Sequence, residues 1–309
     1  MRIALLAGGT GGAKLAAGMQ EEIGSDLSVI ANGGDDIEIL GVHVSPDPDL
    51  ITHWLSGEID EERGWGLKDD SFTVFERLTK LGAPSWFGLS DRDLAACLYR
   101  RQFLEEGGSL TDAQAQIARG LGVQARVLPM CEAPVRTRVL TAAGGRGLQE
   151  YLIVDGGQPE VHGVELEGIE AAEPSREVLD ALRAAEAIVI GPSNPVISIG
   201  PILAVPGMTE AITASAAPVI AVSPFVAGQV VKGPTERFMQ ALGRPSTAAG
   251  VASLYTGLID AMIVDEGDPD PPPAEIPTHA ASTLMEGAAG RARVARIVLD
   301  YAASLVEGA

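Results

Sequence analysis

The fold is decided by the stretch Ile3-Ala4-Leu5-Leu6-Ala7-Gly8-Gly9-Thr10-Gly11-Gly12-Ala13-Lys14. Its first five residues are all apolar, which is typical of a strand buried on both faces of a parallel sheet. A helix is expected next, over Lys14–Glu22. Glycines between a strand and a helix permit positive φ and let an anion approach the free N–H groups of the helix start. The stretch therefore predicts a phosphate-binding turn, unless the glycines serve packing alone.

This glycine loop differs from two well-known phosphate motifs. It lacks the Gly-Lys-Ser/Thr ending of a Walker A loop, and Lys14 stands where G-x-G-x-x-G has its last glycine. The four histidines (His43, His53, His162 and His279) are scattered and form no ligand pattern, so we expect structural or solvated roles for them. The missing fingerprint and the lack of a proton-relay histidine weigh against an NAD-dependent oxidoreductase.

Short apolar runs of the same kind recur along the chain and are mostly separated by helical patterns. Alternating strands and helices with all-apolar strands predict an α/β fold with a doubly wound, mostly parallel, Rossmann-like sheet. A last amphipathic helix is expected from about Gly290 to Leu305. The further buried strands are expected at Leu27–Ala31, Ala187–Ile190, Val219–Val222 and Ala261–Val264.

The middle of the chain has a different pattern and predicts an inserted, smaller α+β subdomain over residues 86–174. Residues 1–85 and 175–309 would then form the nucleotide-binding core. Within the insertion, Thr111 and Gln114 have the spacing of a capping box at a helix start. Strands are expected at Val123–Leu128, Val135–Leu140 and Leu148–Val154, the last two joined by a Gly144–Gly147 turn.

Composition narrows the possible partners and the compartment. The formal net charge of −20 would repel a phosphate backbone, so nucleic acid is excluded as an expected partner. The two cysteines lack metal-site spacing and suggest no disulfide framework. Neither a signal peptide nor an apolar run of membrane-spanning length is found in the sequence, so we expect a reduced, cytoplasmic location.

Carboxylates follow the second strand and appear again shortly after it. Asn32-Gly33-Gly34-Asp35-Asp36 lies where an acid grips a ribose in dinucleotide-binding folds, or it is a glycine turn with solvated acids. In Ser45-Pro46-Asp47-Pro48-Asp49 the prolines predict an extended backbone with both acids on one side. That arrangement suits Mg²⁺ bound by carboxylates and substrate phosphates, although Asp49 alternatively caps a helix beginning near Leu50.

Two later loops also follow strands and carry polar groups. Gly191–Pro201 contains Ser193, Asn194 and Ser198, which either bind phosphates or a base, or bond their own backbone. Ser223-Pro224 is followed downstream by Lys232, a possible partner for phosphate or an ordinary surface lysine. Since ligands of open α/β folds bind at the carboxyl ends of the strands, these loops are expected to meet at one edge.

Two further segments are ambiguous. In Glu62-Arg63-Gly64-Trp65-Gly66 a planar cation and an aromatic face lie beside glycines, which suits either a ring-binding edge or core packing of Trp65. Ser90-Asp91-Arg92-Asp93 reads as a helix start capped by Ser90, although Arg92 alternatively reaches a phosphate.

Taken together, these segments make the chain resemble the 2-phospho-L-lactate transferase family of coenzyme F-420 biosynthesis, which includes the bacterial phosphoenolpyruvate transferases. The resemblance covers nearly the whole chain. Two positions depart from the family pattern. Pro48 stands where the family usually has an aliphatic residue, and Ser90 stands where it usually has a glycine. The motifs that carry the resemblance are Gly8–Leu15, Asn32 with Asp35-Asp36, Ser45–Asp49, Arg63–Gly66, Ser90–Asp93, Gly191–Pro195 with Ser198–Pro201, and Ser223-Pro224 with Lys232–Pro234.

The resemblance implies a Mg²⁺-dependent homodimeric enzyme. It would transfer a 2-phospholactyl or phosphoenolpyruvyl group from a guanosine diphosphate conjugate to the 5-deazaflavin Fo, with release of GMP. No residue indicates which three-carbon acid is carried. The alternative is a non-catalytic regulator of the related family that binds nucleotide sugars.

The roles that follow from the loops and the resemblance are hypotheses. The expected catalytic residues are Asp49, Asp47 and Lys232, and the expected metal ligands are Asp49, Asp47 and Asp36. The nucleotide is expected to contact Gly8, Gly9, Thr10, Gly11, Gly12, Lys14, Gly191, Pro192, Ser193, Asn194 and Ser198. The deazaflavin is expected to contact Asp49, Arg63, Trp65, Asp91, Arg92, Ser223 and Pro224.

Overall fold

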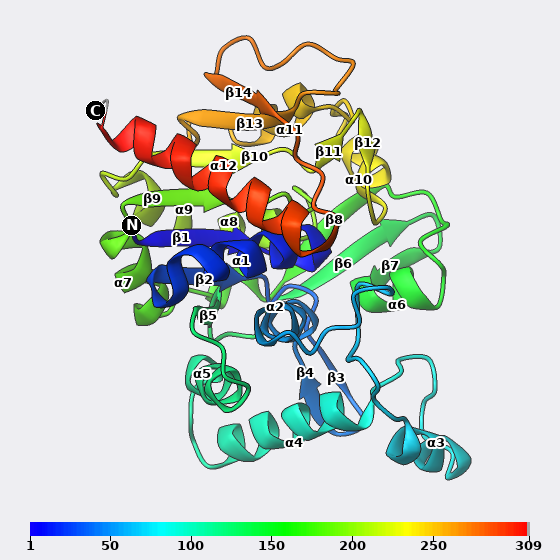
Figure 1. The fold of residues 1–309 in the computed structure, drawn as a ribbon. Helices are drawn as coiled ribbons and strands as arrows, with labels where there is room; N and C mark the ends of the chain where they lie inside the picture. Colours follow the sequence, from blue (N-terminus) through cyan, green and yellow to red (C-terminus); the bar gives the residue numbers. More distant parts are fainter. Residues whose placement is uncertain (308–309) are drawn as a thin grey trace.

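A seven-stranded parallel sheet forms the centre of the computed structural model, which describes residues 1–307 (Figure 1). Its strand order is β14-β13-β10-β9-β1-β2-β5, and every neighbouring pair is parallel. The strands are β1 (Ile3–Ala7), β2 (Leu27–Ala31), β5 (Arg126–Pro129), β9 (Ala187–Ile190), β10 (Val219–Val222), β13 (Ala261–Asp265) and β14 (Thr278–Ala281). The predicted doubly wound sheet is confirmed, and so are the five strands assigned to its core.

The strand order reverses between β1 and β9. From β1 the chain extends the sheet through β2 to β5, and it then returns to add β9, β10, β13 and β14 on the other side. Such a reversal opens a crevice at the carboxyl ends of the two central strands, where ligands of open α/β sheets bind. The loops that follow β1 and β9 are the two glycine-containing loops, so the topology places both at this crevice.

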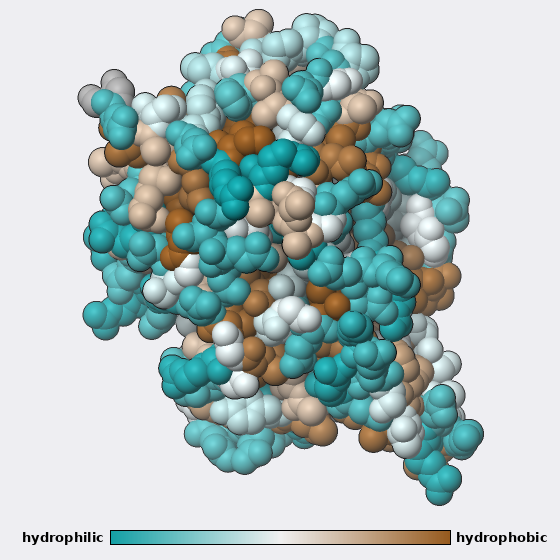
Figure 2. All heavy atoms as spheres, in the orientation of Figure 1, coloured by the Kyte–Doolittle hydropathy of each residue, from teal (hydrophilic) through white to brown (hydrophobic). Residues whose placement is uncertain are grey.

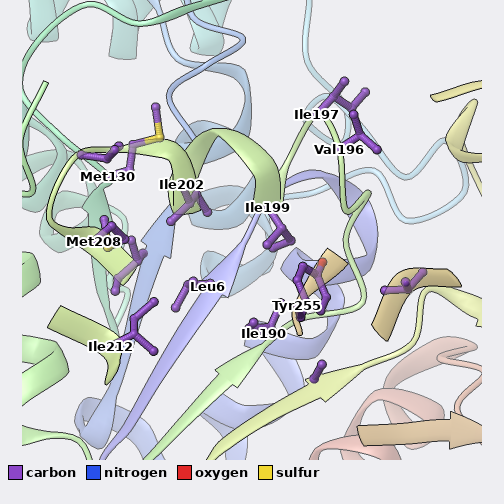
Figure 3. Packing of buried hydrophobic residues seen from close by; sticks show 14 of the residues in the cluster. Leu6, Met130, Ile190, Val196, Ile197, Ile199, Ile202, Met208, Ile212 and Tyr255 are labelled. Atoms are coloured by element: carbon purple, nitrogen blue, oxygen red, sulfur yellow. The ribbon is translucent and has the colours of Figure 1, made fainter. Parts of the chain in front are cut away.

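Helices cover the sheet on both faces because its strands are apolar on both sides. Ile3, Leu5 and Ala7 of β1 face one layer, and Ala4 and Leu6 face the other. The first layer consists of α1 (Gly9–Ile23), α2 (Pro46–Ser56) and α12 (Gly287–Glu307). The second consists of α7 (Arg176–Ala184), α8 (Ile199–Ala204), α9 (Met208–Thr213), α10 (Thr235–Ala241) and α11 (Ala248–Leu254), packed as Figure 3 shows around Leu6, Ile190, Ile199 and Ile202.

The chain leaves the sheet for two long excursions, one on each side of β5. The first builds the part drawn below the sheet in Figure 1, and the second builds the part beside α6. The first contains β3 (Ile37–Ile39), β4 (Val42–Val44), α2, α3 (Thr73–Lys80), α4 (Asp91–Glu105) and α5 (Leu110–Gly120). The second contains β6 (Arg136–Thr141), β7 (Gly144–Gly147), α6 (Leu148–Ile153) and β8 (Gly163–Glu167), the strands forming a sheet of order β7-β6-β8.

Short elements complete the chain. The short elements are the hairpin β11 (Phe225–Val226) and β12 (Gln229–Val230), and the 3₁₀ turns Gly24–Asp26 and Ile169–Ala171.

The domain division at residues 86 and 174 stays a prediction. However, β5 lies inside that segment and pairs with β2 as the edge strand of the main sheet.

Several local predictions were wrong. Gly144–Gly147 was expected to be a turn, but it is strand β7 and pairs with β6. Leu148–Val154 was expected to be a strand, but α6 occupies it, because Leu148 and Tyr151 at helical spacing bury one face. Ser45–Asp49 was expected to be extended, but α2 begins at Pro46 with Ser45 at the N-cap. Proline is accepted in a first helical turn because the N–H it lacks has no partner there. Asp49 is therefore inside the helix and is not its cap.

The predicted helix starting near Thr111 is confirmed as α5, but the capping residue is different. Ser109 is the N-cap, and its Oγ accepts a hydrogen bond of 3.0 Å from the N–H of Asp112. The predicted last helix is confirmed as α12.

Most of the face seen in Figure 2 is hydrophilic, with hydrophobic residues in small separated patches. Within the described residues no helix is long and apolar enough to cross a bilayer.

The close packing of α1 on α12 generates a test of the fold. A Cβ added to Gly18 of α1 would lie 2.5 Å from the carbonyl oxygen of Arg291 and 3.1 Å from Cβ of Ala295. Gly18→Ala is therefore expected to lower the free energy of unfolding by about 1–3 kcal/mol through overpacking, measured by urea denaturation.

Gly120 of α5 offers the matched control, because no atom lies within 4 Å of its added Cβ. Gly120→Ala is expected to leave stability unchanged or raise it by up to about 1 kcal/mol. Equal effects of the two substitutions would contradict the close approach of α1 and α12.

Candidate active site

Two cavities meet at the carboxyl ends of the central strands and share the side chains of Asp35 and Asp47. The glycine-loop cavity has a volume of about 460 Å³ and lies beside the loops that follow β1 and β9. The aromatic cavity has a volume of about 500 Å³ and lies between α2, α6 and the segment before α4. A ligand in each cavity would therefore have one end beside the same pair of carboxylates.

Close neighbours of the glycine loop leave little room for side chains at its glycine positions. A Cβ on Gly8 would collide with the Asp47 carboxylate and would lie 2.8 Å from Cβ of Ser198. A Cβ on Gly11 would collide with the carbonyl oxygen of Pro192. Gly9 has a φ of +61°, which L side chains rarely adopt. The glycines thus let the two loops and α2 close on one another, so packing and ligand access are both served.

The shared carboxylates are joined by one amide. Nδ2 of Asn32 donates to Oδ2 of Asp47 at 2.9 Å and to Oδ1 of Asp35 at 3.3 Å. The N–H of Gly9 donates to Oδ1 of Asp47 at 2.6 Å, and Nε2 of Gln149 donates to Oδ2 of Asp35 at 2.9 Å. The glycine loop, β2, α2 and α6 thereby hold the two acids in place.

Both shared carboxylates are ionised less readily than ordinary acids. Burial raises the pKa of Asp35 well above its usual range, and the charges of Asp47 and Asp36 raise it further. Burial raises the pKa of Asp47 to about 6, although the hydrogen bonds from Asn32 and Gly9 oppose this. Two buried acids of this kind at a cavity junction favour a cation or a proton-transfer role.

The three acids predicted to bind metal do not converge. Asp49 forms a buried ion pair with Arg100, whose Nη2 also donates to Oε1 of Gln114 at 3.1 Å. Oδ2 of Asp36 lies 2.9 Å from Nε2 of His43 and 2.9 Å from the Ser45 hydroxyl. No group of three or more Asp, Glu, His or Cys within residues 1–307 is arranged to bind a metal by itself. The geometry therefore favours Asp35 and Asp47 over the predicted set.

Lys14 and Lys232 line the glycine-loop cavity, and neither forms a salt bridge with a carboxylate among residues 1–307. Nζ of Lys14 donates to the carbonyl of Met285 at 3.3 Å, and Nζ of Lys232 donates to the carbonyl of Arg63 at 2.9 Å. Burial lowers the pKa of both, and the charge of Arg291 lowers that of Lys14 further. The charge of Lys14 also lowers the pKa of Lys232, and both lysines line the same cavity.

The remaining walls of the glycine-loop cavity were predicted in part. Ser193 and Ser198 line it, and Ser193 Oγ accepts the Gly8 N–H at 3.2 Å. Ser223 and Pro224 also line it, although a deazaflavin role was expected for them. Asn194 reaches the wall, but its amide bonds the N–H groups of Val196 and Ile197 and the hydroxyl of Thr235. Gly12 and Gly191 do not line the cavity.

The aromatic cavity gathers large flat side chains in a protein that has few of them. Two of the three tryptophans and two of the six phenylalanines line it, namely Trp65, Trp86, Phe72 and Phe87. The Arg63 guanidinium lies 5.6 Å from the Trp65 ring centroid. Edge-to-face and stacked contacts favour a planar ring in such a space.

Two residues predicted to contact the deazaflavin lie outside both cavities. The Asp91 carboxylate accepts hydrogen bonds from the N–H groups of Thr73 and Val74 at 3.2 and 3.0 Å, so it caps α3. Arg92 lies 3.6 Å from Asp70 and 3.5 Å from Glu58. The lining residues that the sequence prediction missed include Asp35, Leu148, Gln149, Leu152, Val230, Val231 and Thr283–Glu286, and in the aromatic cavity His53, Phe72, Trp86, Phe87 and Asp93.

The sheet order and the paired cavities define the class as a Rossmann-like α/β protein with a two-part ligand site at its switch point. Residues 3–290 match the family model described as 2-phospho-L-lactate transferase CofD. The chain belongs to this family.

Relatives with curated names agree with the family match. The chain is 38% identical over 265 residues to the 2-phospho-L-lactate transferase of Methanosarcina mazei, covering 85% of this chain and 87% of that protein. It is 39% identical over 313 residues to the phosphoenolpyruvate transferase of Streptomyces griseus, covering 98% of each. A solved UPF0052-family structure from Bacillus halodurans matches with a TM-score of 0.64 at 19% identity, covering 96% and 98% of the two chains, and this shows the fold alone.

The Asp49–Arg100 pair generates a stability test. Arg100 is fully buried, so Arg100→Met leaves an uncompensated charge on Asp49. We expect a loss of about 3–5 kcal/mol in the free energy of unfolding, measured by guanidinium denaturation. Combining Arg100→Met with Asp49→Leu is expected to restore most of this loss, and failure to do so would contradict the pairing.

The raised pKa of Asp47 generates a pH test in metal-free protein. A carboxyl whose folded pKa is about 6 favours folding below about pH 4 and loses that contribution as the pH rises through 6. Asp47→Asn is therefore expected to gain stability relative to wild type by as much as about 2–3 kcal/mol between pH 4 and pH 7.

Asp265 provides the control, because its pKa is shifted in the opposite direction from that of Asp47. Burial acts to raise its pKa, but hydrogen bonds from Thr283, Gly267 and Ala227 hold that pKa below its usual range. Asp265→Asn should therefore lose relative stability as the pH rises. A pH-independent difference for Asp47→Asn would show that its carboxyl is not perturbed.

Proposed function

We propose that this protein transfers a 2-phospholactyl or phosphoenolpyruvyl group from a guanosine diphosphate conjugate to the deazaflavin Fo, releasing GMP, in coenzyme F-420 biosynthesis. The observation that carries the proposal is the junction of two unlike cavities at Asp35 and Asp47. Transfer between two substrates needs their reacting atoms side by side, and this junction is where two bound ligands would meet. The names of the curated relatives support the same reaction class.

The glycine-loop cavity suits the donor. The start of α1 presents free N–H groups toward it, and Lys14 and Lys232 add positive charge. Apolar residues such as Leu152 and Val230 line another part of the wall and suit a base. A diphosphate would thus lie on the glycine loop, with its substituted phosphorus toward Asp47.

The aromatic cavity suits the acceptor. Its four large aromatic side chains match a flat tricyclic ring, and its other end reaches the carboxylate junction. A ring held there would direct its ribityl chain toward Asp35 and Asp47. The hydroxyl oxygen would then bond to the phosphorus as the bond from that phosphorus to the GMP oxygen breaks.

Catalysis in this arrangement consists of positioning and charge neutralisation. Asp35 and Asp47 fit a Mg²⁺ ion because two buried carboxylates plus substrate phosphates are the ligands it usually takes, and it would neutralise charge on the phosphates. Asn32 and Gln149 fix the orientation of the two acids. Their raised pKa values also suit acceptance of the proton from the attacking hydroxyl.

The competing function is a regulator that binds a nucleotide sugar without turnover. Such a protein needs the glycine loop but has no use for a second cavity that ends at the same acids. The aromatic cavity therefore favours the transferase. Both 2-phospholactate and phosphoenolpyruvate remain donors to test, since relatives of both names match the chain.

The decisive measurement is GMP release from each guanosine diphosphate conjugate, with and without Fo and with Mg²⁺ or EDTA. We expect release that requires both Fo and Mg²⁺. Asp47→Asn and Asp35→Asn are each expected to lower kcat by about 10² or more, in the range usual for groups that position or transfer protons.

Asp155→Asn is the matched control, because Asp155 lies outside both cavities in a salt bridge with Arg146. It should retain activity within a few-fold. Nucleotide binding without any Fo-dependent GMP release would support the regulator.

A further inference from the structure

The aromatic cavity has a polar end that the proposed reaction does not use. His53 of α2 and Asp93 of α4 both line it, and Nδ1 of His53 lies 3.8 Å from Oδ1 of Asp93. The second Asp93 oxygen accepts a hydrogen bond of 2.7 Å from the Ser90 hydroxyl. Ser90 lines the same wall, so this end presents hydroxyl, carboxylate and imidazole groups together.

His53 is unusual in how little of its bonding capacity is used. Its exposed fraction is only 5%, and the contact with Asp93 is the one polar contact found for its ring within residues 1–307. A separation of 3.8 Å is too long for a hydrogen bond. Burying an imidazole without a partner costs free energy unless water or a ligand supplies one.

Two other buried acids are matched to donors. Asp49 is paired with Arg100, and Asp265 accepts from Thr283, Gly267 and Ala227. Buried polar atoms without a partner also occur elsewhere in the described residues, among them Oδ1 of Asp36 and Nε1 of Trp54, but those residues do not line the aromatic cavity, whereas His53 does. The incomplete bonding of His53 indicates a place where a polar group of a ligand would complete it.

The position of His53 along α2 fits one end of an extended ligand. His53 follows Asp47 by six residues, and at 1.5 Å per residue the two lie about 9 Å apart along the helix axis. The junction acid Asp47 and His53 thus line the same aromatic cavity at positions about two helical turns apart. A planar acceptor whose side-chain hydroxyl reaches Asp47 would bring its ring to the region of His53.

We infer that His53, positioned by Asp93, determines acceptor specificity by hydrogen bonding the polar edge of the flat ring held among Trp65, Trp86, Phe72 and Phe87. His53 contacts the ring-edge N–H, carbonyl or hydroxyl, and Asp93 positions the imidazole through Nδ1. The inference rests on the proposed transfer to a deazaflavin and adds the residues that read its ring. The pair belongs to the acceptor cavity alone, since neither residue lines the glycine-loop cavity.

The test separates recognition of the acceptor from recognition of the donor. His53→Leu is expected to raise the KM and the Kd for Fo by about tenfold or more, as loss of one hydrogen bond in a buried site implies. The KM for the guanosine conjugate should stay within twofold, and kcat at saturating Fo within a few-fold. Steady-state kinetics with each substrate varied in turn, and calorimetric titration with Fo, provide these numbers.

His53→Gln keeps an N–H donor and is expected to recover at least half of the lost affinity on a logarithmic scale. Asp93→Asn is expected to weaken Fo binding less than His53→Leu, because it removes only the positioning charge. Thermal unfolding of each variant identifies a general loss of structure, which would raise both KM values together.

Several outcomes would overturn the inference. A wild-type KM for Fo in His53→Leu would do so, as would equal increases in both KM values, or no recovery in His53→Gln. Failure of the proposed function is a separate result, because then the wild-type protein itself shows no Fo-dependent GMP release.

Discussion

The site depends on one close approach, that of α2 to the loop after β1. Gly8 has no side chain, and the Asp47 carboxylate occupies the space that a Cβ would need. The N–H of Gly9 then donates to the same carboxylate. An acid is thereby placed inside a cavity otherwise built for anions. The same carboxylate also accepts a hydrogen bond from Asn32, whose amide reaches Asp35 as well.

The buried carboxylates at this contact would repel a negatively charged ligand. A diphosphate beside Asp35 and Asp47 would bring negative charges together in a buried place, within a protein of net charge −20. The nearby acid Asp49 is neutralised by Arg100, so it adds little to the repulsion. Among residues 1–307 no arginine or lysine forms a salt bridge with Asp35 or Asp47, and Lys14 and Lys232 line the glycine-loop cavity. A divalent ion between the acids and the phosphates is the simplest remedy.

The sequence predicted the parts that follow from local patterns. Apolar strands ending in glycine loops indicated the sheet and its binding edge, because burial on both faces leaves a continuous apolar run. The sequence could not indicate whether Asp35 or Asp36 lines the cavities, because the directions of consecutive side chains in a turn are set by the tertiary fold. The helix at Pro46 was misread because proline suits both an extended segment and a first helical turn. The arginine partner of Asp49, 51 residues away, left no local signal.

The two cavities are built from different parts of the fold. The glycine-loop cavity is built mainly from loops at the strand ends, which the sheet fixes in position. The aromatic cavity is built from α2, α6 and the segment before α4, all within the two excursions from the sheet. Helix α2 belongs to both cavities, because its Asp47 contacts the glycine loop while His53, further along the same helix, lines the aromatic cavity alone. Substitutions in the part of the lining that only the aromatic cavity uses are therefore expected to leave the loops at the strand ends undisturbed.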